Sequence, residues 1–203
     1  MFDVGANRGQ CCAVVRRALG ARAVGLHAFE PNADAFAELA RRVGGQAGVR
    51  LNRVALGARR GRARLFYDRP ASGLASLTRR DLAHLGITFA LSEDVEVETL
   101  DEYCRAQGVE RIDLLKLDVE GHELDVLRGA TGMLGAGRVG LVTFEFGGCH
   151  VDTRTFVRDF FRLFGEYGMA LARITPSGYL TPLPRYREDL EQFRTTNFVA
   201  IRP

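Results

Sequence analysis

Three acidic residues stand where short apolar segments of the sequence end, and their placement indicates a ligand-binding site. Asp3 precedes a run with glycine at positions 5 and 9, whereas Glu30 and Asp118 each follow an apolar run. Glycine has no Cβ, so the backbone can turn sharply there and approach a ligand closely. Open α/β sheets bind their ligands at the carboxyl ends of the strands. We therefore expect the three acids to share one site beside a nucleotide-binding loop at residues 3–9.

The acidic character of this site limits the nucleotide that it could bind. Crowded acids repel phosphates, and the glycine loop at residues 3–9 has the spacing of neither G-x-G-x-x-G nor a Walker A motif. S-adenosylmethionine fits better, because it carries a sulfonium cation, an amine and a ribose diol but no phosphate. Glu30 is the expected ribose clamp, since a carboxylate can accept hydrogen bonds from both hydroxyls. The structural alternatives are Asp3 as a cap of the first helical turn and Glu30 as a surface acid before Pro31.

Composition indicates an ordinary globular chain. Its 203 residues are 46% hydrophobic and 26% charged, with a net charge of +3, which suggests one domain. No apolar run approaches the ~20 residues that cross a bilayer, and the N-terminus lacks the features of a signal peptide. We expect a cytoplasmic protein without membrane insertion. The 4 cysteines form no C-x-x-C pair, which argues against a zinc site or a disulfide framework.

The basic residues are unevenly distributed. The segment 50–80 contains nine arginines and a single acid, Asp68, whereas Lys116 is the only lysine of the chain. An arginine-rich segment can bind phosphates or nucleic acid. Because no nucleic-acid motif accompanies it, we interpret the segment as a solvated face and expect no nucleic-acid partner.

Alternating strand and helix patterns predict an α/β sandwich with a mostly parallel sheet. Strands are expected at residues 1–4, 23–29, 49–56, 62–67, 94–98, 112–119, 139–146, 170–175 and 196–201. Helices are expected at residues 10–19, 33–43, 100–106, 122–134 and 153–167. Asn32 and Thr99 are suited to cap two of these helices. Residues 72–78 are expected to form a flexible polar loop.

Three motifs resemble those of a known family, the FkbM family of S-adenosylmethionine-dependent methyltransferases. They are Asp3-Val4-Gly5-Ala6-Asn7-Arg8-Gly9, Ala28-Phe29-Glu30-Pro31-Asn32 and Lys116-Leu117-Asp118-Val119-Glu120-Gly121-His122-Glu123. The resemblance implies a class I methyltransferase fold, a Rossmann-like three-layer α/β sandwich whose mostly parallel seven-stranded sheet has one antiparallel strand. It implies a single domain over residues 1–203 that methylates a hydroxyl of a sugar, a glycan or a secondary metabolite.

The resemblance also guides the choice of site residues. The expected cofactor residues are Asp3, Gly5, Ala6, Asn7, Gly9, Glu30, Pro31, Ala55, Leu56, Ser76 and Asp118. The expected catalytic residues are Lys116, Glu120, His122 and Glu145. His122 has a suitable unperturbed pKa for a general base, with Glu120, Glu145 and His150 as rivals. Lys116 would pair with Glu120 or Glu145 in a buried ion pair or orient the acceptor oxygen.

Several alternatives stay open at this point. Asp118, Glu120, Glu123 and Glu145 could bind a divalent metal ion, although we expect none. A non-catalytic nucleotide- or glycan-binding module and a nicotinamide-dependent oxidoreductase are the competing functions. Relatives usually carry residues before the first strand, so the start at Met1 predicts either a truncated N-terminus or a more open pocket.

Overall fold

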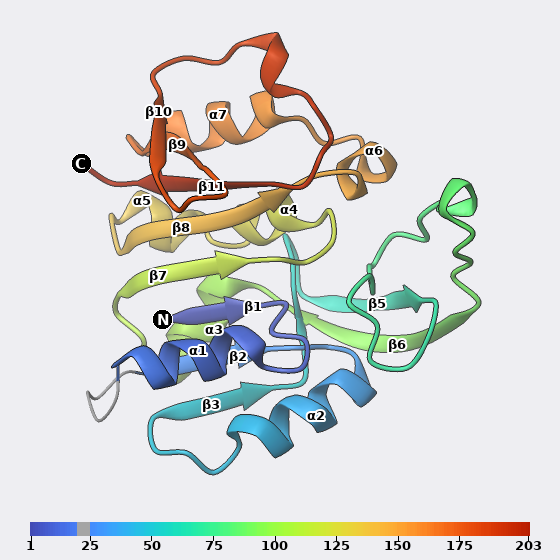
Figure 1. Cartoon of the computed structure of the whole chain (residues 1–203). Coiled ribbons are helices and arrows are strands. Elements are labelled where there is room, and N and C mark those ends of the chain that lie inside the picture. Colours follow the sequence, from blue (N-terminus) through green and yellow to red (C-terminus); the bar gives the residue numbers. More distant parts are fainter. Residues whose placement is uncertain (20–24) are drawn as a thin grey trace.

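The computed structural model describes residues 1–19 and 25–203 and contains one large sheet (Figure 1). Its strands, in spatial order, are β10 (Leu180–Leu183), β9 (Ala170–Ile174), β11 (Thr196–Ile201), β8 (Val139–Phe146), β7 (Ile112–Leu117), β1 (Phe2–Val4), β2 (Leu26–Phe29) and β3 (Val49–Asn52). The helices are α1 (Gln10–Leu19), α2 (Ala33–Val43), α3 (Leu100–Gln107), α4 (Glu123–Arg128), α5 (Thr131–Gly135), α6 (Cys149–Thr153) and α7 (Val157–Glu166). Two 3₁₀ turns, η1 (Ala83–Leu85) and η2 (Glu188–Leu190), complete the set.

The strand directions confirm a mostly parallel α/β sheet but correct its expected size. The neighbours from β3 through β8 pair in parallel, whereas β11 runs antiparallel to both β8 and β9, and β10 runs antiparallel to β9. The sheet therefore has 8 strands instead of seven, and two of them, β11 and β10, oppose the rest. The additional strand β10 is a short edge strand with Pro182 inside it, and proline weakens any strand signal in the sequence.

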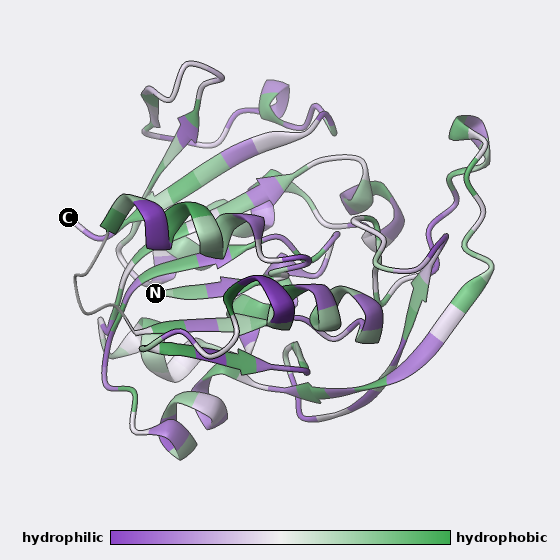
Figure 2. Ribbon diagram, turned by 60° about the horizontal axis from the view of Figure 1, so that its bottom comes forward, coloured by the Kyte–Doolittle hydropathy of each residue, from purple (hydrophilic) through white to green (hydrophobic). Residues whose placement is uncertain are grey.

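Helices cover both faces of the sheet. Because side chains alternate along a strand, Phe29 of β2 joins the core under α3, α4, α5 and α7, whereas Leu26 and Ala28 join the core under α1 and α2. The first core includes a stack of aromatic rings, with Phe144 of β8 4.4 Å from Phe160 of α7 between centroids. In Figure 2 hydrophobic residues follow the central strands, whereas the helices carry both hydrophobic and hydrophilic residues. Among the described residues, no helix is long and apolar enough to cross a membrane.

A second, smaller sheet stands beside the carboxyl ends of the large one (Figure 1). Its strands, in order, are β4 (Ala55–Leu56), β6 (Leu91–Glu98) and β5 (Gly61–Tyr67). The single strand expected at 49–56 is therefore wrong, because the chain leaves the large sheet after β3 and joins the small one as β4. The arginines of β5 face acids of β6, as in the pair Arg62–Glu96 at 2.7 Å, and both side chains are more than half exposed. This pairing agrees with the interpretation of the basic segment as a solvated face.

Two helix predictions were too long. The helix expected at 122–134 is divided into α4 and α5 near Gly129, where a Cβ would lie 2.1 Å from the carbonyl oxygen of Gly57. The close contact between Gly129 and Gly57 holds the backbone in place where α4 ends and α5 is about to begin. The helix expected at 153–167 begins only at Val157, and the short helix α6 precedes it.

Other boundaries were predicted closely. The ranges of α1, α2, β8 and β11 agree with the expected ones. The side chain of Asn32 accepts a hydrogen bond from the Ala35 amide, and that of Thr99 accepts one from the Glu102 amide, which confirms both caps. The strand expected at 23–29 is described from Leu26 on, and residues 23–24 lie outside the described part of the chain.

The division between α4 and α5 generates a stability prediction. Gly129→Ala should lower the free energy of unfolding by about 1–3 kcal/mol, because its Cβ has no room beside Gly57 and overpacking carries a cost of that size. The control is Gly165→Ala in α7, where nothing lies within 4 Å and alanine should stabilise the helix by about 0.5–1 kcal/mol. Urea denaturation measures both, and equal effects would contradict the packing explanation.

Candidate functional site

A cavity opens at the carboxyl ends of β1, β2 and β7, where the strand order reverses between β1 and β7. Such a reversal is the usual ligand site of an open α/β sheet. The expected site residues that line it are Gly5, Asn7, Glu30, Pro31, Ala55, Leu56, Ser76, Asp118, Glu120 and His122. The expected residues that do not line it are Asp3, Ala6, Gly9, Lys116 and Glu145. Lining residues that sequence reasoning missed include Phe29, Leu65, Ser72, Gly73 and Val119.

The glycine turn and Glu30 form one hydrogen-bonded unit on the cavity wall. Gly5, with φ of +77°, starts the turn, and its missing Cβ would lie 1.8 Å from the carbonyl oxygen of Asp118. Glu30 Oε2 accepts a hydrogen bond from the Asn7 amide at 2.9 Å, and Oε1 accepts one from the Asn32 amide at 2.8 Å. The carboxyl group is buried, and burial raises its pKa to about 7. A carboxylate has about four acceptor positions, so Glu30 keeps acceptor capacity for a ligand.

Lys116 lies between two acids beneath the cavity. Its Nζ is 3.1 Å from Asp3 Oδ1 and 3.2 Å from Asp118 Oδ2. Burial opposes the ammonium charge, but the two carboxylates outweigh burial and raise the pKa of Lys116 above its ordinary value. Glu120 or Glu145 was expected to pair with Lys116, and this prediction is wrong. For Glu120, the reason is that β7 ends at Leu117, after which the chain turns and no longer alternates like a strand.

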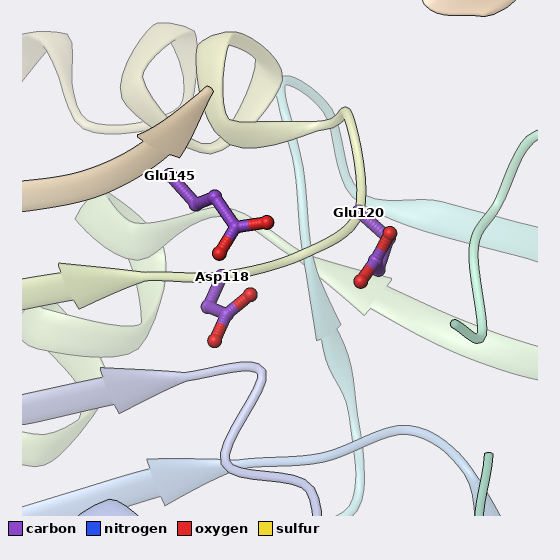
Figure 3. A group of neighbouring side chains, drawn as sticks. All are labelled: Asp118, Glu120 and Glu145. Atoms are coloured by element: carbon purple, nitrogen blue, oxygen red, sulfur yellow. The ribbon is translucent and has the colours of Figure 1, made fainter. Parts of the chain in front are cut away.

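Three carboxyl groups, one of them that of Asp118, meet near the end of β7. Oxygens of Asp118, Glu120 and Glu145 lie within 4.8 Å of one another, from the end of β7, the following turn and β8 (Figure 3). Burial is the main cause that raises the pKa of Glu120 to about 8; Arg80 opposes this shift, and neighbouring acids add to it. Burial and the same kind of neighbours raise the pKa of Glu145. The cluster can therefore hold a proton at neutral pH. Glu123, the fourth acid considered for a metal, does not join this cluster.

A segment that we call the strap, residues 71–80, contributes several residues to the lining of the cavity. Near its start, Asn7 Nδ2 donates a hydrogen bond to the Ser72 carbonyl at 3.1 Å, and Arg8 Nη2 donates one to the Ala71 carbonyl at 2.9 Å. Ser72 and Ser76 are both buried. The flexible polar loop expected at 72–78 is thus a packed wall of the site, because its small polar residues bind backbone groups that a single sequence does not reveal.

The end of the strap contacts the acid cluster. Ser76 Oγ donates a hydrogen bond to the Glu120 carbonyl at 2.8 Å. Arg80, whose side chain is 8% exposed, lies 2.5 Å from Glu120 Oε2 and 3.3 Å from Asp152 Oδ2 of α6. Sequence reasoning missed Arg80, because nothing distinguishes it from the other arginines of the basic segment.

The two histidine candidates for a general base lie in different surroundings. His122 lines the cavity, but Nδ1 is 3.0 Å from Asp125 Oδ2 and Nε2 is 2.9 Å from Thr78 Oγ1, so both ring nitrogens already have partners. His150 is fully buried and lies 3.0 Å from Glu123. His150 is not among the residues that line the cavity.

The fold and the site define an α/β protein whose ligand cavity contains three acids, Glu30, Asp118 and Glu120, and no lysine or arginine among its described lining residues. Residues 3–169 match the family model described as the Methyltransferase FkbM domain. The chain therefore belongs to the FkbM methyltransferase family, as the sequence motifs predicted.

Individual relatives agree with this assignment. The 2-O-methyltransferase NoeI of Sinorhizobium fredii is 33% identical over 140 residues, which are 64% of this chain and 56% of that protein. Methyltransferase sdnD of Sordaria araneosa is 50% identical over 48 residues, 20% of this chain and 18% of that protein. The crystal structure of methyltransferase FkbM from Methylobacillus flagellatus KT aligns with 98% of this chain and 42% of that one, with a TM-score of 0.57 and 14% identity. The chain spans about half the length of NoeI.

The ion pair beneath the cavity generates a second prediction. Lys116→Met should lower the free energy of unfolding by about 3 kcal/mol, because it leaves Asp3 buried and uncompensated. The double variant with Asp3→Asn should cost less than the sum of the two single variants, by about 0.5–3 kcal/mol. As a control, Arg111→Met removes an exposed pair with Asp113 and should change stability by less than about 1 kcal/mol. Additive costs in urea denaturation would contradict the coupling.

The acid cluster generates a prediction about pH. The folded protein holds a proton on Glu120 up to a pKa of about 8, whereas an unfolded glutamate releases it near ~4.3. Between these values the folded state binds more protons, so the stability contributed by this group is present at low pH and is lost as the pH rises toward 8. Glu120→Gln should therefore gain stability relative to wild type between pH 5 and pH 9, on the order of 1–3 kcal/mol. A difference independent of pH would refute the raised pKa.

Proposed function

We propose that the protein transfers a methyl group from S-adenosylmethionine to a hydroxyl of a sugar, a glycan or a secondary metabolite. The observation that carries the proposal is Glu30, a buried carboxylate on the wall of a cavity whose described lining contains no cation for a phosphate. The chemistry of this donor set fits a nucleoside with a free ribose diol and a positive charge. Membership in the FkbM methyltransferase family supports the same conclusion.

The cavity offers separate groups for each part of the cofactor. Glu30 would accept hydrogen bonds from the ribose hydroxyls, and Leu56 and Phe29 provide apolar surface for the adenine. Asn7 and the carboxylate of Asp118 would hold the polar methionine end. When bound, S-adenosylmethionine supplies an electrophilic methyl group on a good leaving group. The protein has to orient the acceptor hydroxyl toward that methyl group, and orientation of this kind contributes several kcal/mol to catalysis.

The acid cluster is suited to take the proton of the acceptor hydroxyl. A carboxylate with a raised pKa is a stronger base than an ordinary one, and general bases work best when their pKa is near the operating pH. Glu120 and Glu145 both have a raised pKa. We therefore favour one of them over His122, whose ring nitrogens are both engaged. Lys116 would hold the Asp118 carboxyl group in position beside the cofactor.

A sugar hydroxyl is the favoured acceptor, because the relative NoeI is named as a 2-O-methyltransferase. The competing function is a module that binds a nucleotide or a glycan without catalysis. Such a module would need the cofactor wall but not the acid cluster. Incubation with methyl-labelled S-adenosylmethionine and a panel of monosaccharides and oligosaccharides separates the two, because a binding module leaves the label on the cofactor.

The role of Glu30 generates a prediction about cofactor affinity. In calorimetric titrations, wild type should bind S-adenosylmethionine and not NAD, and Glu30→Ala should weaken binding by about 1.5–3 kcal/mol, the usual contribution of hydrogen bonds to a charged group. The control is Glu96→Ala on β6, an exposed acid paired with Arg62, which should bind like wild type. No heat with S-adenosylmethionine at millimolar concentration would refute the proposed function, and unchanged affinity in Glu30→Ala would remove this residue from the site.

A further inference from the structure

Glu123, at the start of α4, turns away from the cavity and binds backbone instead. Its side chain is almost fully buried. Oε1 accepts a hydrogen bond from the Val119 amide at 2.8 Å, and Oε2 accepts one from the Gly121 amide at 3.1 Å. These amides stand on either side of Glu120, whose φ is +55°. A residue other than glycine is strained in this conformation and needs support from its surroundings. The Glu123 carboxylate provides that support.

His150 connects this carboxylate to the turn after β8. Its Nδ1 accepts a hydrogen bond from the Gly147 amide at 3.2 Å, which requires the ring proton to be on Nε2. Nε2 lies 3.0 Å from Glu123 Oε2, although the angle departs from that of a regular hydrogen bond. A buried N–H needs an acceptor, and Glu123 is the one within reach among the described residues. The imidazole therefore bridges two turns.

The two turns are also in close steric contact. Gly121 has a φ of +103°, and a Cβ there would lie 3.0 Å from the Cys149 carbonyl oxygen and 2.9 Å from Thr153 Cγ2 of α6. Little space is left between the turn after β7 and the start of α6. A shift of one turn therefore has to move the other.

We infer that Glu123 and His150 are positioning residues that join the turn at 118–121 to the turn at 147–150. Through these turns they set the separation of Asp118 and Glu120 from Glu145, which precedes the second turn on β8. Neither residue lines the cavity, so both act through the backbone of the turns. The catalytic meaning of this coupling rests on the proposed function, whereas the coupling itself can be measured without cofactor or acceptor.

The first test replaces Glu123 with glutamine. The amide of Glu123→Gln has one acceptor oxygen, and its NH₂ group must face at least one of the three N–H donors. The matched control is Asp101→Asn, because Asp101 also accepts hydrogen bonds from two backbone amides, those of Gly132 and Met133, and these amides lie outside both turns. Both variants should lose thermal stability, which calibrates the general cost of removing such a carboxylate.

Hydrogen exchange of the cofactor-free proteins shows whether the turns are coupled. In Glu123→Gln, the peptides that cover 118–122 and 147–150 should both exchange about tenfold faster, since a hydrogen bond that holds each turn is lost or weakened. In Asp101→Asn both peptides should exchange as in wild type. Faster exchange of the first peptide alone, or equal changes in the two variants, would overturn the inference.

A second pair of variants tests the bridge through His150. His150→Gln can place a donor where Nε2 lies, whereas His150→Asn can replace only the acceptor Nδ1. Affinity for S-adenosylmethionine should fall about tenfold in His150→Asn and be largely kept in His150→Gln, with exchange at 118–122 following the same order. Equal affinities in the two variants, after comparison of their thermal stabilities, would reduce His150 to a packing residue. If wild type itself binds no S-adenosylmethionine, the proposed function fails, and the exchange results still decide the coupling.

Discussion

Lys116 lies between the carboxylates of Asp3 and Asp118, and the charge balance of the whole site depends on this contact. Five acids gather near the carboxyl edge of the sheet, and without a cation their mutual repulsion would oppose folding. Lys116 neutralises the lower part of the group, and Arg80 contacts the upper part through Glu120. Burial is the main cause that raises the pKa of Glu120 and of Glu145, and neighbouring acids add to the effect. The site thus places acids that pair with Lys116 next to acids whose pKa is raised.

Sequence patterns predicted the regular part of the fold and failed where close contact between distant segments decides the structure. The α1 and α2 helices have local signals, such as the Asn32 cap, and their bounds were predicted correctly. The break between α4 and α5 depends on the approach of Gly129 to Gly57, which are far apart in the sequence. The departure of β4 into a second sheet also depends on a distant partner, β6. Periodicity within one segment contains no information about either contact.

In the candidate site, too, local sequence signals were predictive and contacts between distant segments were not. Most of the expected cofactor residues line the cavity, because a strand end and a glycine turn can be recognised locally. The strap was misjudged, since its serines are buried by contacts with Asn7 and Glu120 from elsewhere in the chain. The partners of Lys116 were also misjudged, because β7 ends one residue before Asp118 and the alternation of side chains ends with it. Local motifs were thus enough to predict where the site lies. The pairing of its charged side chains could be determined only from the three-dimensional structure.

The use of arginine for every other basic residue has a consequence for the chemical reactivity of the protein. Lys116 provides the only side-chain amine of the chain, and its raised pKa keeps this amine in the ammonium form, which is not a nucleophile. Reagents that acylate amines at neutral pH should therefore spare the side chains of the folded molecule. Once the ion pair opens, the same amine becomes reactive, so acylation of a single residue would report the integrity of the site.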